Sequence, residues 1–527
     1  MKIVNNAFLL LLIFVFIFTF YNICAVPKNN VILVDVGKSS ITVEKKILGN
    51  NFLGYDPTTY ESWSKQYYGY SDYGAGLWDP EKKTFVNEVT ALAIEAGISA
   101  VRFPGGCGAH HYDWKTAIGS KRKHFLYGID EFLKTCEEIK AEPILTVSYF
   151  TGDEHDATDL VEYLNAPNDG SNLNGGIDWA KQRAKNVHPL PYGVNYFEIG
   201  NEVYDGDSRR IKNVSAEEYA ARYLKYYYAM KAIDPKIKIG VVLYTDDWNR
   251  KLLRIVNDNL DFAIIHLYPT PARGERLERM KPENIFEISL GIPIFEYENI
   301  FQGSLRLLKK TSGKDVLIAV TEYNGGFAQE KPVPYRYCLG TALLNAELIR
   351  IFMEPQNRIL MANYWNFVNE YWGMIANDFD GTRKTLYNNY YKRPNFYVFE
   401  LYHKHFGDSL LLTKVDSGYY MVENNRIPYL SVNASIDKDK NKVYLMVINK
   451  NLQGSITASI ELKDFKPSKT GHFWVLNGPS IDATNEVNHN NIRIKDGEFR
   501  IDRPIFKFTF EPHSLTAIEI AESKNEN

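Results

Sequence analysis

Three consecutive segments decide the fold: YFEIG (196–200), AEEYAARYLKYYYAMKA (216–232) and IKIGVVL (237–243). The first and third are short, nearly continuous apolar runs, as expected of strands that are buried on both faces of a sheet. The middle segment is amphipathic, and Ser215, directly before it, is a typical helix N-cap. The order of strand, helix and strand predicts a unit of parallel sheet.

The same alternation runs through most of the chain. Eight candidate strands lie at residues 52–55, 98–104, 143–149, 196–200, 237–243, 262–268, 316–322 and 359–367. Amphipathic segments such as 85–96 and 128–139 separate them. Eight strands alternating with helices predict an α/β protein with a (β/α)8 TIM barrel, with an open doubly wound sheet as the alternative. No glycine-rich phosphate loop follows the first candidate strand, which disfavours a dinucleotide-binding sheet.

The pattern changes after about residue 393. Helical periodicity gives way to short alternating strands with turn residues between them, which predicts a C-terminal antiparallel β-sandwich domain. The strand-like N-terminal segment should pair with this sandwich. The expected organisation is a signal peptide at 1–25, N-terminal strands joining the sandwich at 26–46, the barrel at 47–392 and the β-sandwich at 393–527.

The first 25 residues have the composition of a signal peptide. Lys2 precedes a 14-residue apolar run at residues 7–20, and residues 23–25 offer a small-residue cleavage site. A helix needs about 20 apolar residues to cross a bilayer, so a signal peptide is favoured over a membrane anchor. We therefore expect an exported protein, secreted or held in the periplasm or cell envelope, with no membrane contact after cleavage.

Composition restricts the classes of partner. The chain has 527 residues and a formal net charge of −3, so it lacks the basic field that attracts nucleic acid. Aromatic residues make up 14%, and the aromatic-rich segments 55–78 and 365–372 suit either core packing or a wall of sugar subsites. Cys107, Cys136 and Cys338 can form at most one disulfide and fit no zinc pattern. No cofactor is expected.

Polar residues end several candidate strands, at the edge where the active site of a barrel lies. Glu202 follows the fourth strand and Glu322 ends the seventh, so both can face one cavity. A retaining glycosidase needs two carboxyl groups about 5–5.5 Å apart, one as nucleophile and one as acid and base. Each Glu could instead cap a helix or pair with a surface lysine. Arg102, His266 and Tyr268 at neighbouring strand ends favour the catalytic interpretation.

These motifs, in this order, resemble the retaining glycoside hydrolases of the large (β/α)8 clan, most closely the family 51 α-L-arabinofuranosidases. The similar stretches are RFPGGCGAHHYDW (102–114), ATDLVEYLN (157–165), YGVNYFEIGNE (192–202), HLY (266–268), TEYN (321–324) and RPNFYVFELY (393–402). The resemblance implies an enzyme in which Glu202 is the acid/base and Glu322 the nucleophile. It also implies a set of substrate-binding or supporting residues, namely Arg102, Cys107, Asn201, His266, Tyr268, Trp365 and Asn366.

The resemblance further implies a polysaccharide or oligosaccharide substrate and a homo-oligomer. Three positions depart from the family pattern: Gly54 replaces a Glu, Cys107 an Asn and Asn366 a Gln. Because such positions bind substrate, the sugar stays open, and a β-xylosidase or endo-β-glucanase of the same clan is the alternative. A catalytically inactive carbohydrate-binding barrel is the third hypothesis. No metal is expected, since His110 and His111 lack further ligands at a suitable spacing, and Cys107 lacks a base that would make it a catalytic thiol.

Overall fold

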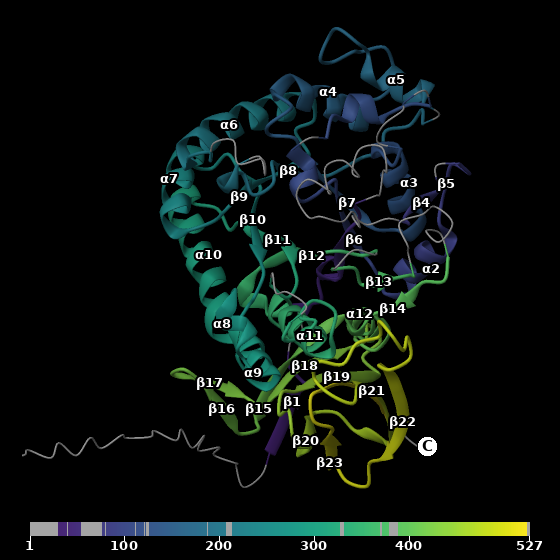
Figure 1. Ribbon diagram of the computed structural model, residues 1–527, viewed down its shortest axis with the longest axis vertical. Helices are drawn as coiled ribbons and strands as arrows, with labels where there is room; N and C mark the ends of the chain where they lie inside the picture. The colour runs from purple at the N-terminus through teal and green to yellow at the C-terminus, as the bar shows by residue number, and fades with distance from the viewer. Residues whose placement is uncertain are drawn as a thin grey trace, which may run out of the picture.

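The molecule consists of a barrel surrounded by helices and a sheet-rich C-terminal part packed below it (Figure 1). The computed structural model describes residues 30–38, 41–53, 76–79, 81–110, 112–120, 122, 126–186, 188–206, 213–326, 331–368, 372–378 and 388–523. The predicted signal peptide and most of the aromatic segment 55–78 lie outside the described residues. The predicted fold class, a TIM barrel with a C-terminal β-sandwich, is confirmed.

Eight parallel strands close into the barrel. In chain order they are β3 (Gly49–Asn51), β6 (Ala100–Phe103), β7 (Glu142–Val147), β8 (Tyr196–Ile199), β9 (Lys238–Val242), β10 (Phe262–Leu267), β11 (Leu317–Tyr323) and β12 (Ile359–Tyr364). Each strand pairs with the next, and β12 returns to β3 with Asn363 opposite Gly49. This closure excludes the open doubly wound sheet.

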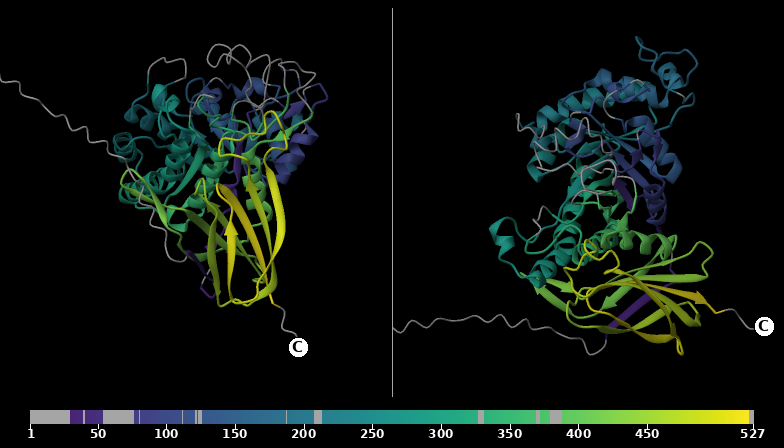
Figure 2. Two further views of the ribbon diagram at one scale, coloured as in Figure 1. Left: turned by 60° about the horizontal axis from the view of Figure 1, so that its bottom comes forward. Right: turned by 45° about the vertical axis from the view of Figure 1, so that its right-hand side comes forward.

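Helices cover the outside of the barrel (Figures 1 and 2). They include α2 (Asn87–Glu95), α3 (Ile129–Ile139), α4 (Glu154–Asn165), α5 (Trp179–Lys185), α6 (Ala216–Ile233), α7 (Asp246–Val256), α8 (Glu275–Glu278), α9 (Pro282–Ile292), α10 (Glu298–Ser312) and α11 (Leu339–Met353). Helix α6 begins where its sequence predicts, because the Ser215 hydroxyl accepts a hydrogen bond from the Glu218 amide at 3.1 Å.

The first barrel strand begins earlier than predicted. The apolar pair Phe52 and Leu53 suggested a strand at 52–55, but both side chains are buried just beyond the end of β3. The strand itself consists of Gly49, Asn50 and Asn51 and has no apolar run. The polar Asn51 side chain is accommodated inside the barrel because its amide donates to three main-chain carbonyls of β11 and β12. Asn51, rather than Gly54, therefore occupies the carboxyl end of this strand, and Gly54 lies outside the described residues.

The C-terminal part is a ten-stranded assembly. Its strands are β1 (Asn30–Asp35), β2 (Ile41–Thr42), β15 (Ser409–Asp416), β18 (Leu430–Ile436), β19 (Lys442–Asn449), β20 (Ile456–Lys463), β21 (Pro467–Asn477), β22 (Arg493–Arg500), β23 (Ile505–Phe510) and β24 (Ser514–Glu522). Strand β15 connects the two layers, since its start pairs with β18 and its end with β1. All pairs are antiparallel except β1 with β20. An apolar core that includes Ile32, Leu445, Val447 and Phe510 fills the interior.

One helix lies where only strands were expected. Helix α12 (Pro394–Lys404) follows Arg393 and packs with α11 between the barrel and the sandwich (Figure 1). Its buried residues surround most of the helix, so the sequence shows no amphipathic period. The barrel core continues across this junction to Met446 and Leu515 of the sandwich. The barrel core thus extends into the adjoining layer of the sandwich, which also has the separate core described above.

Two details concern the C-terminal strands. Residues 493–500 form one continuous strand, β22. Strand β16 (Tyr419–Val422) pairs with β17 (Asn425–Pro428) in a hairpin separate from the sandwich, which packs on α9. Within the part of the chain that the structure describes, Cys107, Cys136 and Cys338 are not joined by a disulfide.

Within the described ranges, we find no helix whose length and apolar character would suit a membrane span.

Candidate active site

The barrel brings most of the predicted site residues to one place at the carboxyl ends of its strands. Those that are joined there by hydrogen bonds or ion pairs are Arg102, Asn201, Glu202, His266, Tyr268 and Glu322. They come from β6, β8, β10 and β11 or from the residues directly after these strands. Their convergence follows from the parallel barrel, in which all strands end on the same face.

Glu322 is buried and held at both carboxylate oxygens. Its Oε1 accepts from Arg102 Nη1 at 2.8 Å, and its Oε2 accepts from the Tyr268 hydroxyl at 2.7 Å. Burial, together with the charge of Glu322, raises the pKa of Tyr268. The phenol therefore stays protonated and acts as the hydrogen-bond donor to Glu322. The two donors fix the direction in which the carboxylate points.

Arg102 is the centre of the cluster and is fully buried. Its guanidinium donates to Glu198 Oε1 at 2.5 Å, to Asn201 Oδ1 at 2.8 Å and to Asn51 Oδ1 at 3.3 Å, besides its bond to Glu322. Burial alone lowers the pKa of Arg102, but the charges of Glu198 and Glu322 outweigh it and raise the pKa. A permanent cation thus stands between two carboxylates.

Sequence reasoning missed Glu198 and Asn51 as members of the site. Glu198 lies in the middle of β8 between apolar neighbours and is fully buried, where Thr146 also donates to it. A charged residue within an apolar strand requires a partner, and this signal was available in the sequence. Asn51 was hidden because the first strand was placed too late.

Glu202 occupies an unusual backbone conformation. Its φ of 38° and ψ of 41° lie in the left-handed region, which residues other than glycine rarely adopt. Such strain is typical of functional sites and persists only where the surroundings enforce it. The side chain is 28% exposed, whereas that of Glu322 is 6% exposed. Glu202 therefore faces the open side of the cluster.

His266 lies between the two candidate catalytic carboxylates. Its Nδ1 is 2.9 Å from Glu202 Oε1 and 3.7 Å from Glu322 Oε2, while its Nε2 is 3.0 Å from Thr321 Oγ1. Burial lowers the pKa of His266, but the adjacent carboxylates outweigh this and raise it. Burial raises the pKa of Glu202, yet the hydrogen bond and charge of His266 lower it overall. Both shifts favour the proton of this pair on the imidazole rather than on Glu202.

The carboxylates are close enough for joint chemistry. One oxygen of Glu202, one of Glu322 and a ring nitrogen of His266 lie within 4.8 Å of one another. Among the described residues, this is also the group that could hold a metal ion, although the Arg102 cation already neutralises part of its charge. His110, considered above as a metal ligand, is buried edge-on against Phe150, and His111 lies outside the described residues.

An apolar wall adjoins the carboxylates. Trp365, Trp372 and Leu53 form a buried cluster against which Tyr268 packs. Gly106 has a φ of 54°, and a Cβ added to it would overlap the Trp365 ring. Glycine is therefore required at Gly106 both by the backbone conformation and by the close approach of this ring.

Cys107 and Asn366 lie next to this wall in the chain. Cys107 is half-buried at the start of the 3-10 helix Cys107–His110, which directly follows the diglycine. Asn366 follows Trp365 and is fully buried. Arg102, His266 and Tyr268 contact the two carboxylates directly.

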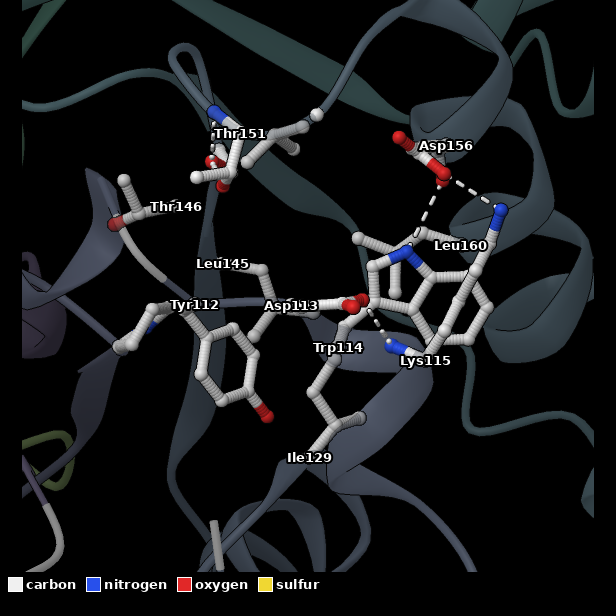
Figure 3. Close-up of a pocket in the computed structure, with 14 residues that line it drawn as sticks. Tyr112, Asp113, Trp114, Lys115, Ile129, Leu145, Thr146, Thr151, Asp156 and Leu160 are labelled. Carbon is white, nitrogen blue, oxygen red and sulfur yellow. Dashed lines mark hydrogen bonds and ion pairs between the residues drawn. The ribbon is translucent and has the colours of Figure 1, made fainter. Parts of the chain in front are cut away.

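A cavity of about 330 Å³ opens beside the ends of β6 and β7 (Figure 3). Leu145, Ile129 and Leu160 form its apolar side, and Lys115 pairs with Asp156 at its rim at 2.6 Å. Thr146 lines it and also donates to Glu198, which connects the cavity to the Arg102 cluster. Neither candidate catalytic carboxylate lines this cavity.

Two family models match the chain. Residues 94–281 match the model described as "Alpha-L-arabinofuranosidase 1 domain", and residues 321–514 match "Alpha-L-arabinofuranosidase C-terminal domain". The chain belongs to glycoside hydrolase family 51, the α-L-arabinofuranosidase family. The predicted class of enzyme, a glycoside hydrolase, is thereby confirmed.

Relatives of this glycoside hydrolase span nearly all of its length. An intracellular exo-α-L-arabinofuranosidase of Bacteroides ovatus is 23% identical over 486 residues, 84% of this chain and 89% of the relative. A probable α-L-arabinofuranosidase C of Aspergillus niger is 23% identical over 509 residues, 88% and 94%. The solved GH51 α-L-arabinofuranosidase from Thermotoga petrophila superposes with a TM-score of 0.75 at 25% identity, covering 93% of this chain and 99% of its own.

The prediction of an exported protein, secreted or periplasmic, is wrong. Relatives from Bacteroides ovatus, Bacillus subtilis, Acetivibrio thermocellus and Bifidobacterium longum are named intracellular enzymes. The prediction rests on Lys2, a short apolar run and a small-residue stretch at 23–25, which are compositional signals alone. The comparisons do not support a signal peptide.

Proposed function

We propose that this glycoside hydrolase is an α-L-arabinofuranosidase that retains the configuration of the sugar, with Glu322 as nucleophile and Glu202 as acid and base. The observation that carries the proposal is the short separation of the two carboxylates, since one oxygen of Glu202 lies within 4.8 Å of one oxygen of Glu322. Retaining enzymes hold these groups about 5–5.5 Å apart, whereas inverting enzymes need about 6.5–9.5 Å to admit a water molecule.

In the first step, one oxygen of Glu322 attacks the anomeric carbon and the glycosidic C–O bond breaks. Glu202 gives its proton to the departing oxygen, so the leaving sugar departs as a neutral alcohol. The Arg102 and Tyr268 bonds to Glu322 support the nucleophile role, because they fix its orientation before the substrate arrives.

In the second step, Glu202 accepts a proton from water while the water oxygen attacks the anomeric carbon. The bond to Glu322 breaks, which frees both the sugar and the enzyme. The partial exposure of Glu202 supports this role, since the acid/base group must meet both the leaving group and the water.

His266 supplies the proton that the first step requires. A general acid is expected to be protonated in the free enzyme, yet the pKa of Glu202 is lowered by its hydrogen bond to His266. The imidazole, 2.9 Å away, holds the proton and returns it to Glu202 as charge develops on the leaving oxygen. The pair thus acts as one acid with a shared proton.

Asn201 is proposed to bind the sugar. Its Oδ1 accepts from Arg102, so its amide N–H group is the one that can donate to the sugar 2-hydroxyl, as the family resemblance implies. The identity of the sugar rests on the relatives, which are named α-L-arabinofuranosidases.

The test uses purified protein with aryl α-L-arabinofuranosides, β-xylosides and β-glucans. We expect turnover of the arabinofuranoside, with the first product formed in the retained configuration by NMR. Glu322→Ala should lose at least about 10⁴-fold in kcat, while Glu217→Ala, on the exposed face of α6, serves as the matched control. Preference for a β-xyloside or internal cleavage of a glucan would replace the proposed sugar specificity.

Azide separates the two carboxylate roles. With a good leaving group, Glu322→Gly plus azide should give a glycosyl azide of inverted configuration, because azide takes the place of the nucleophile. Glu202→Ala plus azide should give the retained configuration, because azide attacks the intermediate on Glu322. Opposite outcomes for the two variants would reverse the assignment.

A further inference from the structure

Two tyrosines form a stack beside Glu202. Tyr204 lies in the 3-10 helix Val203–Asp205, directly after Glu202, and Tyr244 follows β9. Their ring centroids are 3.8 Å apart and their planes differ by 5°. Tyr204 is half-buried, whereas Tyr244 is 54% exposed. The stack therefore extends from the acid/base residue to the surface and ends in an exposed aromatic ring.

The exposed ring is mounted on a fixed backbone. The Tyr244 amide donates to Asn249 Oδ1 at 2.8 Å, and the Trp248 indole donates to the Val242 carbonyl at 3.1 Å. The Trp248 ring also contacts Tyr204 edge-on, with centroids 6.0 Å apart. A rigid aromatic surface binds with a smaller loss of conformational entropy than a mobile one, so this geometry suits ligand binding.

Tyr204 connects the stack to the chemistry. Burial raises its pKa, and the neighbouring Glu202 charge raises it further, so Tyr204 keeps its proton and can hydrogen-bond to Glu202. The acid/base group must lie next to the oxygen of the departing sugar. The leaving group is therefore on the Glu202 side of the cleaved bond, and this is the side on which the tyrosine stack stands.

We propose that the Tyr204–Tyr244 stack is the binding platform for the leaving-group sugar, with the exposed face of Tyr244 covering the apolar C–H face of that sugar ring. The ligand class is an oligosaccharide, whose leaving group is itself a sugar. The inference rests on the proposed function, because it assigns the leaving side from the role of Glu202. Aromatic rings with one apolar face open are suited to such contacts.

An exposed tyrosine elsewhere offers a matched control. Tyr228 on α6 is 57% exposed, close to the value for Tyr244, but it meets Tyr227 edge-on, with planes at 83°. It is a surface tyrosine without a stacked partner. Replacing it removes the same exposed phenol from a helix that carries none of the proposed catalytic residues.

The experiment compares two substrates that share the arabinofuranosyl group. One is an α-(1→5)-linked arabino-oligosaccharide and the other is α-L-arabinofuranosyl fluoride, whose fluoride leaving group has no sugar ring to stack. In Tyr244→Ala, the ratio of kcat/KM for the oligosaccharide to kcat/KM for the fluoride should fall about 2- to 12-fold, the contribution of one aromatic contact. Tyr244→Phe and the control Tyr228→Ala should keep the wild-type ratio.

Each result decides the inference. An unchanged ratio in Tyr244→Ala, with both substrates turned over by the wild type, overturns the platform and leaves the proposed function intact. A wild type that hydrolyses neither substrate overturns the proposed function and the platform together. Tyr244→Leu covers the case in which the alanine variant unfolds, because it keeps apolar volume over Tyr204 but no aromatic face, and the same fall in ratio is expected.

Discussion

The close approach of Gly106 to Trp365 makes Gly106→Ala a quantitative test of the site's construction. Two costs add. The first is the left-handed conformation at φ 54°, which disfavours any residue with a Cβ by about 1–2 kcal/mol. The second is the overlap of the new Cβ with the Trp365 ring, whose surroundings are fully packed against Leu53 and Trp372. Overpacking of this kind costs about 1–3 kcal/mol.

A second glycine isolates the backbone cost. Gly313 ends α10 with a φ of 70° and a ψ of −7°, and a Cβ built there meets nothing within 4 Å. Gly313→Ala should therefore carry only the first cost, about 1–2 kcal/mol, whereas Gly106→Ala should carry about 2–5 kcal/mol. The difference between the variants reports the contact with Trp365.

The assay has two parts. The apparent melting temperature should fall more in Gly106→Ala than in Gly313→Ala, when both are scanned at one rate. Hydrolysis of an aryl arabinofuranoside should fall in Gly106→Ala, because a displaced Trp365 disturbs the wall beside Glu322, and should persist in Gly313→Ala. Equal melting shifts, or full activity in Gly106→Ala, would refute the packing argument.

Three further predictions concern charge. Glu202→Gln should lower kcat/KM about 10²- to 10⁴-fold on an oligosaccharide but far less on a dinitrophenyl glycoside, because that leaving group needs no proton. Equal losses on the two substrates would contradict the role of Glu202 as the acid. The basic limb of the wild-type kcat/KM profile should lie above pH 6.5, because the carboxylates raise the pKa of His266 above that ordinary value; activity already lost below pH 6.5 would argue against the shared proton. Burial lowers the pKa of Lys450, which meets Glu347 at the barrel–sandwich junction, from 10.5 to about 8. Between those pH values the unfolded chain binds more protons than the folded protein, so the contribution of Lys450 to the free energy of unfolding increases with pH. Lys450→Met should therefore reduce the pH dependence of the melting temperature between pH 8 and 10.

Sequence reasoning located what periodicity and strand ends encode. Seven of the eight barrel strands overlap their predicted ranges because buried parallel strands are continuous apolar runs, and Glu202 and Glu322 were found because polar residues end such runs. The range predicted for the first strand was wrong because its residues, Gly and Asn, form no apolar run. The adjacent apolar pair lies beyond the end of the strand. Helix α12 was missed because a helix buried around most of its surface has no periodic pattern.

The electrostatics of the site could not be predicted from the residues at the strand ends. Predicting which residue holds the proton required the 2.9 Å contact of His266 with Glu202, since the sequence alone suggested a protonated Glu202. The partner of Arg102 within the barrel, Glu198, likewise emerged only from its contact, although its position in an apolar strand was a visible signal.

Counting charges explains why this arrangement suits glycoside cleavage. When the carboxyl groups of Glu198, Glu202 and Glu322 are all ionised, they surround two cations, from Arg102 and a protonated His266. One negative charge is left over in a largely buried site. A transition state of oxocarbenium character carries positive charge, which this excess stabilises more than the neutral substrate. Glu198 is essential to that balance: without it, Arg102 and His266 would neutralise the two reacting carboxylates and the site would hold no surplus charge for the transition state.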